Sequence, residues 1–372
     1  MRDFVHKNPK AGKLCTDLDR PGSPTMTPLP ASPYETNLDE QVPALERAVA
    51  VALDPRLQAL DFSAYERIVL TGMGSSDSAA TAFEFSLIRS GLPVWRLSCS
   101  RLLDTPELLA GRTLLWITSQ SGRSGEAVAL AAQVRGRQDV TVVALTNDPD
   151  SPLAQAAQHV VLLHSGVEAT VSCKSYLNSL AWFHRLGARF RGSSDASAIA
   201  DIRATAAELP HMAAPALMER MDTLAQTILA GPHPRLALVG TGIDSATALA
   251  GALILKEASK VHAEGYVGGA FRHGPIELAG PGLTAVLFGE GSSSDVTMTQ
   301  LSSDLLRAGS TVVTITPKHY PGTQHLAIPS RSEFDRLALG MAAIQRLSVA
   351  LARRGGYVPG QFLFGAKVTS QL

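Results

Sequence analysis

Residues 254–280 read ILKEASKVHAEGYVGGAFRHGPIELAG and bring proton-transfer side chains and small residues together at high density. The first part is predicted to end a helix, and the second to form a glycine-rich turn that leads into His-Gly-Pro. A core helix has no need of such an exit, and a surface helix has no need of so many nearby glycines. The carboxylate of Glu257 and the imidazole of His273 are typical general acid–base groups. The stretch is therefore predicted to form one half of an active site.

Apolar runs alternate with helix-length segments on both sides of this stretch. Upstream, five short apolar runs occupy residues 67–74, 94–100, 113–120, 141–147 and 159–165. After a helical region, further runs occupy residues 236–242, 284–291, 311–317 and 325–329. Continuous apolar strands alternating with helices are typical of a parallel sheet covered on both faces. RIVLTGMG and LALVGTG both end in a Gly-x-Gly turn before a helix of small residues, which predicts two tandem copies of one unit.

The predicted fold class is therefore α/β. A helix capped by Ser32 or Thr36 opens the ordered part, with an apolar stripe at helical spacing from Leu38 to Leu53. The predicted organisation is a flexible lead at 1–33, a first unit at 34–192, a helical connector at 193–230, a second unit at 231–355 and a closing tail at 356–372.

Charge balance and cysteine content narrow the function classes. Lys plus Arg and Asp plus Glu each number 33 in 372 residues, so no basic excess is available to neutralise nucleic-acid phosphates. The widely spaced Cys15, Cys99 and Cys173 fit neither a disulfide framework nor a zinc site. No apolar run reaches the ~18 residues of a membrane span, and no signal peptide opens the sequence. These features predict a cytoplasmic protein with no nucleic-acid, membrane or metal partner.

Three loops rich in hydroxyl groups are expected at the carboxyl ends of strands in the first unit, where open parallel sheets bind ligands. They are residues 74–77, 119–124 and 170–174. Hydroxyls, a Gln amide and free N–H groups at helix starts suit a phosphate monoester. GMGSS lacks the third glycine and the acidic residue of a dinucleotide fingerprint, and it is not a Walker A loop. Each loop alone is equally compatible with helix capping, but the three together favour binding.

The same residues resemble a known family. GMGSS and SQSGRSGE resemble the phosphosugar loops of the SIS (sugar isomerase) family. Residues 238–278, LVGTGIDSATALAGALILKEASKVHAEGYVGGAFRHGPIEL, are similar to the second SIS unit in the isomerase half of glucosamine-6-phosphate synthase and in aminosugar-phosphate deaminases. NLDEQVPAL and GAKVT resemble the opening helix and the closing tail of that family. The resemblance covers about residues 34–372.

The resemblance implies two tandem SIS units, each a five-stranded parallel sheet with helices on both faces. It also implies a homodimer whose active sites take residues from both subunits. In this sequence the sugar phosphate would be held by Ser76, Ser119, Gln120, Ser121 and Ser124. Thr170 and Ser172 would contact the sugar hydroxyls.

Three residues carry the chemistry that the resemblance implies. Glu257 would move a proton between C1 and C2, and His273 would open the sugar ring across the dimer. Lys367 would contact the open chain and could form an imine with the ketose. Plainer interpretations remain open from the residues alone, because Glu257 could be a buried carboxylate paired with Lys256 or Lys260, and Lys367 could be a solvated tail lysine.

The implied function is an aminosugar-phosphate deaminase/isomerase that acts on a hexosamine 6-phosphate without a metal or redox cofactor. Two departures from the synthase stand out. The chain has only a short lead where the synthase has a glutaminase domain, and Ile254 stands where the synthase has a lysine. Two alternatives remain: a deglycase that cleaves a phosphorylated sugar–amine conjugate, and a non-catalytic sugar-phosphate sensor.

Overall fold

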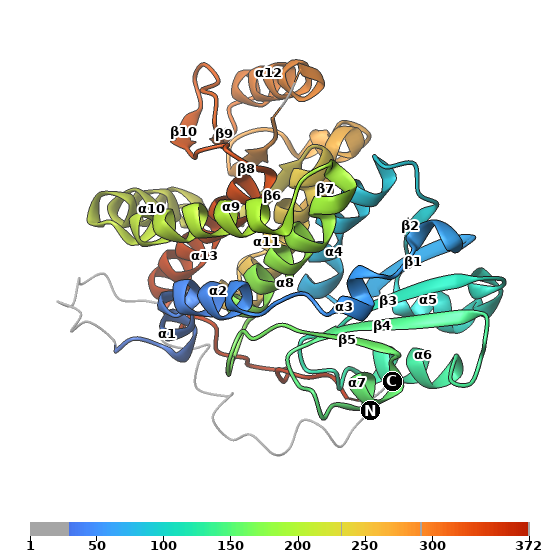
Figure 1. Cartoon of the computed structure of the whole chain (residues 1–372). Helices are drawn as coiled ribbons and strands as arrows, with labels where there is room; N and C mark the ends of the chain where they lie inside the picture. Colours follow the sequence, from blue (N-terminus) through green and yellow to red (C-terminus); the bar gives the residue numbers. More distant parts are fainter. Residues whose placement is uncertain (1–29, 232, 291, 371–372) are drawn as a thin grey trace, which may run out of the picture. The chain divides into compact units, whose positions relative to one another are not determined.

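Two five-stranded parallel sheets form the framework of the protein (Figure 1). The computed structural model describes residues 30–370 except Pro232, Gly291 and the side chains of 292–294. From Ser32 onward, the described chain forms a single compact body that contains both sheets. Almost all of the predicted lead at 1–33 lies outside the described residues. The first sheet has the order β2-β1-β3-β4-β5, with β1 (Arg67–Gly72), β2 (Val94–Arg96), β3 (Thr113–Thr118), β4 (Val140–Thr146) and β5 (His159–Leu162).

The second sheet repeats the topology of the first. It has the order β10-β9-β8-β6-β7, with β6 (Arg235–Gly240), β7 (Ala263–Val267), β8 (Leu283–Phe288), β9 (Thr311–Thr316) and β10 (Gln324–Ala327). In each sheet the first strand lies between the second and the third, and every pairing is parallel. This arrangement confirms the predicted α/β fold with two tandem units.

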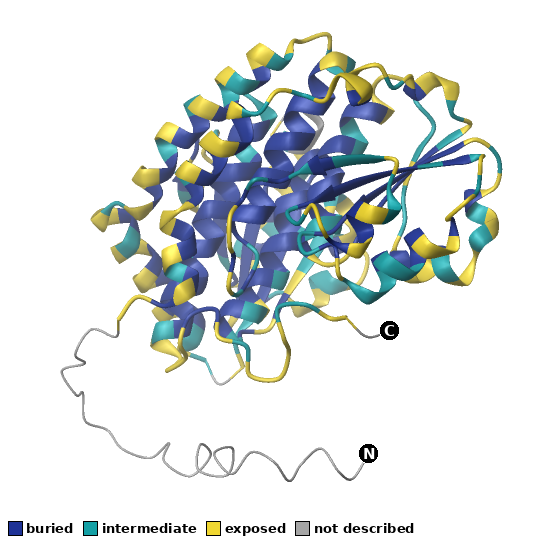
Figure 2. Ribbon diagram, turned by 60° about the horizontal axis from the view of Figure 1, so that its bottom comes forward, coloured by how far each residue is buried: buried dark blue, intermediate teal, exposed yellow. Residues whose placement is uncertain are grey.

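Helices surround both sheets and fill the space between them. They are α1 (Pro33–Asp39), α2 (Gln41–Ala50), α3 (Pro55–Gln58), α4 (Ser75–Ile88), α5 (Cys99–Asp104), α6 (Gly125–Gln133), α7 (Pro152–Ala156), α8 (Lys174–Gly187), α9 (Asp195–Glu208), α10 (Pro215–Leu229), α11 (Ser245–Ser259), α12 (Ser292–Arg307) and α13 (Glu333–Arg354). Figure 2 shows that the buried residues concentrate in the central helices and strands, whereas the outer helices expose one face.

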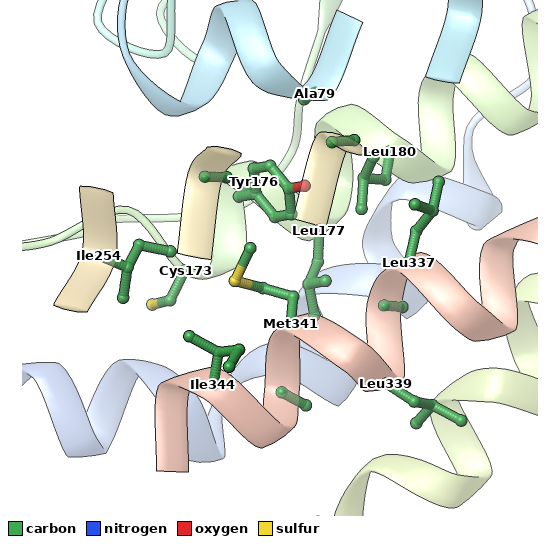
Figure 3. Packing of buried hydrophobic residues seen from close by; sticks show 14 of the residues in the cluster. Ala79, Cys173, Tyr176, Leu177, Leu180, Ile254, Leu337, Leu339, Met341 and Ile344 are labelled. Atoms are coloured by element: carbon green, nitrogen blue, oxygen red, sulfur yellow. The ribbon is translucent and has the colours of Figure 1, made fainter. Parts of the chain in front are cut away.

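The two units share one hydrophobic core. Alternate strand residues divide between the faces of each sheet, so Ile68 and Leu238 point into the shared core while Val69 and Val239 point into smaller clusters on the far faces. Helices α4, α8, α11 and α13 pack against one another in this core (Figure 3). Because both units bury their apolar faces in one core, the start of α4 and the end of α11 are held in a fixed relation.

Three elements differ from the sequence-based expectation. The opening helix begins at Pro33, capped by Ser32, and Glu40 separates it into α1 and α2. The strand expected at 94–100 ends at Arg96, because the hydroxyl of Ser98 accepts from the N–H of Arg101 and starts α5. The glycine-rich turn after α11 contains the edge strand β7, which pairs with β6 alone.

Strand β7 was missed because it carries Glu264 and Gly265 where a central strand would be apolar. An edge strand tolerates such residues because it has a single hydrogen-bonded neighbour. Within the described part of the chain, no helix is both long enough and apolar enough to cross a lipid bilayer.

Candidate active site

A cavity of about 360 Å³ lies at the carboxyl ends of β1 and β3. The starts of α4 and α6, the loop before α8, the last turns of α11 and the C-terminal tail all contribute to it. Its lining residues are Met73, Gly74, Ser75, Ser76, Thr118, Ser119, Gln120, Ser121, Ser124, Glu126, Thr170, Ser172, Leu253, Glu257, Phe362, Lys367, Val368 and Thr369. Segments that are far apart in the sequence therefore meet at the carboxyl ends of the strands, where parallel sheets commonly bind ligands.

The structure brings together all the predicted binding residues and two of the three predicted catalytic residues. The seven binding residues Ser76, Ser119, Gln120, Ser121, Ser124, Thr170 and Ser172 line the cavity, and so do Glu257 and Lys367. His273 does not line it. That residue is exposed and lies at the end of a 3-10 helix (Gly268–Arg272) after β7.

Backbone geometry directs donors into the serine-rich end of the cavity. Gly74 adopts φ 58°, a left-handed conformation that turns the chain from β1 into α4. Gly122 also has a positive φ, and a Cβ there would lie 2.1 Å from the hydroxyl of Ser151. Neither α4 nor α6 has a side-chain cap for its first N–H groups. The carbonyl of Thr369 accepts from the N–H of Gly125, the first residue of α6. Two helix starts that lack side-chain caps, together with several hydroxyls, form an environment suited to an anion.

Two buried hydroxyls in the cavity have no partner among the described residues. These are the Oγ1 atoms of Thr118, the last residue of β3, and of Thr170, in the loop before α8. A buried hydroxyl that makes no hydrogen bond costs roughly 1–3 kcal/mol. Such groups are therefore good candidates for contacts to a polar ligand.

Helix α11 provides the other end of the cavity. Leu253 and Glu257, one helical turn apart, both face it. Burial raises the pKa of Glu257, and the positive charges of Lys367, Lys260 and Lys256 offset part of that increase. The Glu257 carboxylate makes no hydrogen bond or ion pair with any other described side chain, so the plain interpretation as a paired core carboxylate finds no support in the contacts.

The neighbouring residue Ile254 faces the other way. It is fully buried in the core shared by the two units, where Figure 3 shows it beside Cys173. The position at which the synthase has a lysine therefore points toward the core of this protein, and the side chain that reaches the cavity from this turn is Leu253.

The C-terminal tail lines the cavity and is held in place by four contacts. The N–H of Gly360 donates to the carbonyl of Ala258 at 3.1 Å, and Nζ of Lys260 donates to the carbonyl of Gln361 at 2.6 Å. Farther along, Nζ of Lys367 lies 2.8 Å from Oε2 of Glu168. The carbonyl of Thr369 accepts from Gly125. Lys367 is therefore held by a buried partner and is not a solvated tail lysine.

Glu168 is the residue that the sequence-based prediction missed. Its side chain is fully buried in the loop between β5 and α8, beside the predicted binding residues Thr170 and Ser172. The one signal in the sequence was a lone acidic residue two positions before a predicted binding residue. Its partner Lys367 lies 199 residues away, and no local pattern connects the two.

Two other cations near the first unit are paired. Arg123 lies 2.7 Å from Asp148. Lys174 is buried, donates to Glu40 and to the carbonyl of Val167, and does not line the cavity. Glu126, in the first turn of α6, also lines the cavity, and its carboxylate accepts from the hydroxyl of Ser100. The groups that can donate to an anion at the serine-rich end are therefore neutral hydroxyls, an amide and backbone N–H groups. Among the residues with described side chains, no three His, Cys, Asp or Glu form a group that could hold a metal ion.

The equivalent loop of the second unit is filled by an ion pair. After β6, the buried carboxylate of Asp244 lies 3.2 Å from the guanidinium of Arg336, which also pairs with Glu290. Burial raises the pKa of Asp244, and Arg336 offsets part of that increase. The repeat is thus asymmetric, because the first unit presents hydroxyls at a position where the second presents a buried carboxylate and its counter-ion.

The SIS domain family matches two parts of the chain, residues 62–188 and 228–320, which together exceed half of its length. The isomerizing glutamine–fructose-6-phosphate aminotransferase of Pyrococcus horikoshii is 31% identical over 225 residues, covering 60% of this chain and 37% of that protein. The chain thus spans less than half the length of the curated relatives that it matches.

Solved structures share the fold over most of the chain. The C-terminal domain of glucosamine-fructose-6-phosphate aminotransferase from Francisella tularensis matches with a TM-score of 0.76 and 19% identity, over 89% of this chain and 98% of that chain. The glucosamine-6-phosphate deaminase of Thermotoga maritima matches with a TM-score of 0.69 and 18% identity, over 88% and 97%. With two matched segments, each carrying a parallel sheet of the same topology, the chain belongs to the SIS domain family.

Proposed function

We propose that the protein is an aminosugar-phosphate deaminase/isomerase that acts on a hexosamine 6-phosphate. One observation carries this proposal: a partly buried carboxylate without a side-chain partner, Glu257, faces the same cavity as the serine-rich loops. A phosphate held by Ser76, Ser121 and Ser124 would fix one end of the substrate. The carbon atoms at the other end would then lie near α11. The sugar-phosphate enzymes named above share this architecture and support the proposal.

The proposed reaction needs one group that moves a proton and one source of water. After the sugar ring opens, Glu257 takes the proton from C2 and returns it to C1, which converts the 2-amino aldose into the imine of the ketose. Water then adds to the imine carbon and ammonia leaves, giving the ketose 6-phosphate. A carboxyl group whose pKa is raised by burial suits both halves of the transfer, because it accepts and releases the proton more evenly than a solvated one.

Ring opening is assigned in the proposal to His273 of a neighbouring subunit. The imidazole is exposed and lies outside the cavity of its own chain, as a residue contributed across a homodimer would. Mixing two inactive variants tests this arrangement. If Glu257→Gln and His273→Ala subunits exchange, heterodimers contain one intact site, and equal mixing should restore roughly a quarter of the wild-type activity. No recovery despite demonstrated subunit exchange would place both residues in one chain's site, and full activity of His273→Ala alone would remove His273 from the site.

Substrate class is tested with a panel of hexose and aminohexose 6-phosphates, scored separately for ammonia and for ketose. The proposal expects ammonia and ketose 6-phosphate in equal amounts from an aminohexose 6-phosphate. Ketose without ammonia would indicate a simple isomerase. Turnover only of N-substituted conjugates would indicate a deglycase, and binding without any turnover would indicate a sensor.

A further inference from the structure

Glu168 is a buried carboxylate whose hydrogen-bonding capacity is fully used. Its Oε1 accepts from the N–H groups of Cys173 and Ser175, at 2.8 and 3.1 Å. Its Oε2 accepts from the hydroxyl of Ser175 at 2.6 Å and from Nζ of Lys367 at 2.8 Å. Burial would raise the pKa of Glu168, but the ammonium of Lys367 and the hydrogen bonds from Ser175 and Cys173 outweigh it and lower that pKa. The carboxylate is therefore charged where it lies.

The first two contacts place Glu168 at the start of α8. Cys173 is the N-cap residue of this helix and makes no side-chain cap bond itself, so the carboxylate of Glu168 satisfies helix-start N–H groups in its place. A negative charge is favourable at this end of a helix. The loop closed by these bonds includes Thr170 and Ser172, and the hydroxyl of Ser172 also pairs with that of Ser175 at 2.9 Å. Glu168 thus fixes the loop that lines one wall of the cavity.

The remaining contact reaches the tail. Only Lys367 among the described residues of the tail brings a charged group to the cavity, and it is the one that meets Glu168. On either side of Lys367, backbone carbonyls of the tail accept hydrogen bonds. The carbonyl of Gln361 accepts from Nζ of Lys260, and the carbonyl of Thr369 accepts from the N–H of Gly125. Phe362 packs against the shared core, whereas Phe364 is fully exposed, so apolar packing holds the tail at Phe362 but not at Phe364.

We propose that Glu168 is a positioning residue that holds Nζ of Lys367 at the cavity. This inference rests on the proposed function only for the identity of the substrate. Held in this way, Nζ of Lys367 is presented to the open-chain sugar from one fixed position at the wall of the cavity. Its remaining N–H groups are then directed at the ligand.

Tryptic cleavage after Lys367 measures the positioning directly and without any substrate. A lysine whose ammonium is held by a buried carboxylate cannot enter the specificity pocket of trypsin until the tail detaches. Release of the peptide 368–372 is followed by mass spectrometry, with cleavage at the exposed Arg135 as an internal reference. Glu168→Gln should accelerate release about tenfold relative to the reference. Lys367→Arg keeps both the charge and the cleavage site, so the peptide 368–372 should be released from this variant as slowly as from the wild type.

A matched control separates tail positioning from general loosening of the loop. Glu40→Gln removes the carboxylate partner of the buried Lys174. Lys174 is the first residue of α8, directly after the loop that Glu168 holds, and the Glu40–Lys174 pair does not include the tail. This variant should leave release of 368–372 unchanged. If Glu168→Gln fails to fold, Lys367→Gln tests the same contact from the tail, where faster hydrogen exchange of the Gly125 amide is expected. Wild-type rates in both variants would overturn the positioning role.

Failure of the proposed function is distinguishable from failure of this inference, because protected tails with no turnover of any sugar phosphate would remove the function and leave the positioning intact.

Discussion

The N–H of Gly125 donates a hydrogen bond to the carbonyl of Thr369 at 3.0 Å. Gly125 is the first residue of α6, directly after the serine-rich loop, and Thr369 lies two residues beyond Lys367. The tail that leaves the second unit therefore ends on the proposed phosphate-binding half of the site. This bond links the tail, which also lines the cavity, to the start of α6.

Truncation after Ala366 is expected to open the cavity without unfolding the protein. It removes Lys367 and Thr369, while α13, the last helix, ends earlier at Arg354. Affinity for an aminohexose 6-phosphate should fall by about tenfold, corresponding to the loss of one charge-assisted hydrogen bond, and the melting temperature should change little. Calorimetric titration and thermal melting measure the two effects. Truncation after Ser370 is the control, and equal affinities of the two truncated proteins would exclude the tail from binding.

The serine loop should supply a measurable part of the affinity. Ser121→Ala combined with Ser124→Ala is expected to weaken binding of a phosphorylated sugar by about 1–3 kcal/mol per lost charge-assisted bond. The unphosphorylated sugar should bind the variant and the wild type equally. Ser303→Ala, at an exposed hydroxyl of α12, is the control. Unchanged affinity for the phosphorylated sugar in the double variant would remove the phosphate-loop assignment.

Restoring a lysine at the position where the synthase has one is expected to damage the fold. Ile254 is completely buried in the shared core, so Ile254→Lys buries a charge without a partner and should cost more than about 4 kcal/mol of unfolding free energy. Leu253→Lys places the same side chain in the cavity and should cost much less. Urea denaturation of the two variants compares them. A stable Ile254→Lys protein would show that this turn of α11 can face the cavity.

Much of the fold could be predicted from the sequence because its signals are local. Continuous apolar runs mark the central strands, and the repeated Gly-x-Gly turns mark the two units. Local signals were insufficient at two of the edge strands, β2 and β7. There β2 is short because Ser98 starts a helix, and β7 is polar because only one strand pairs with it. These elements are determined by tertiary neighbours rather than by periodicity.

For the site, too, the residues marked by local sequence signals could be predicted, and those that depend on tertiary neighbours could not. Hydroxyl-rich loops at predicted strand ends could be recognised one by one, and the structure gathers them in one cavity. Glu168 could not be recognised, because its role depends on a lysine at the opposite end of the chain and on the N–H groups of α8. The orientation of Ile254 was also inaccessible, since a one-residue step along a helix separates cavity-facing Leu253 from the core.

The pH dependence of stability should report the raised pKa of Glu257. Burial, which is partly offset by Lys367, makes this carboxyl hold its proton more tightly in the folded than in the unfolded state. Its contribution to stability is therefore present at low pH and is lost as the pH rises through the folded pKa. Glu257→Gln, which stays neutral, should be more stable than the wild type at pH 7 and equal to it near pH 4. Urea denaturation at both pH values checks this, and an equal difference at both would contradict it.

Proton transfer by Glu257 is the central claim, and its most direct test is the turnover and affinity of Glu257→Gln toward the best aminohexose 6-phosphate of the panel. Ammonia release by the variant should fall by about 10²–10⁴-fold, while the dissociation constant for the same sugar phosphate stays close to that of the wild type. Glu264→Gln, at an exposed carboxylate of β7 outside the cavity, should keep full turnover. Equal loss of binding and turnover in Glu257→Gln, or undiminished turnover, would contradict the account.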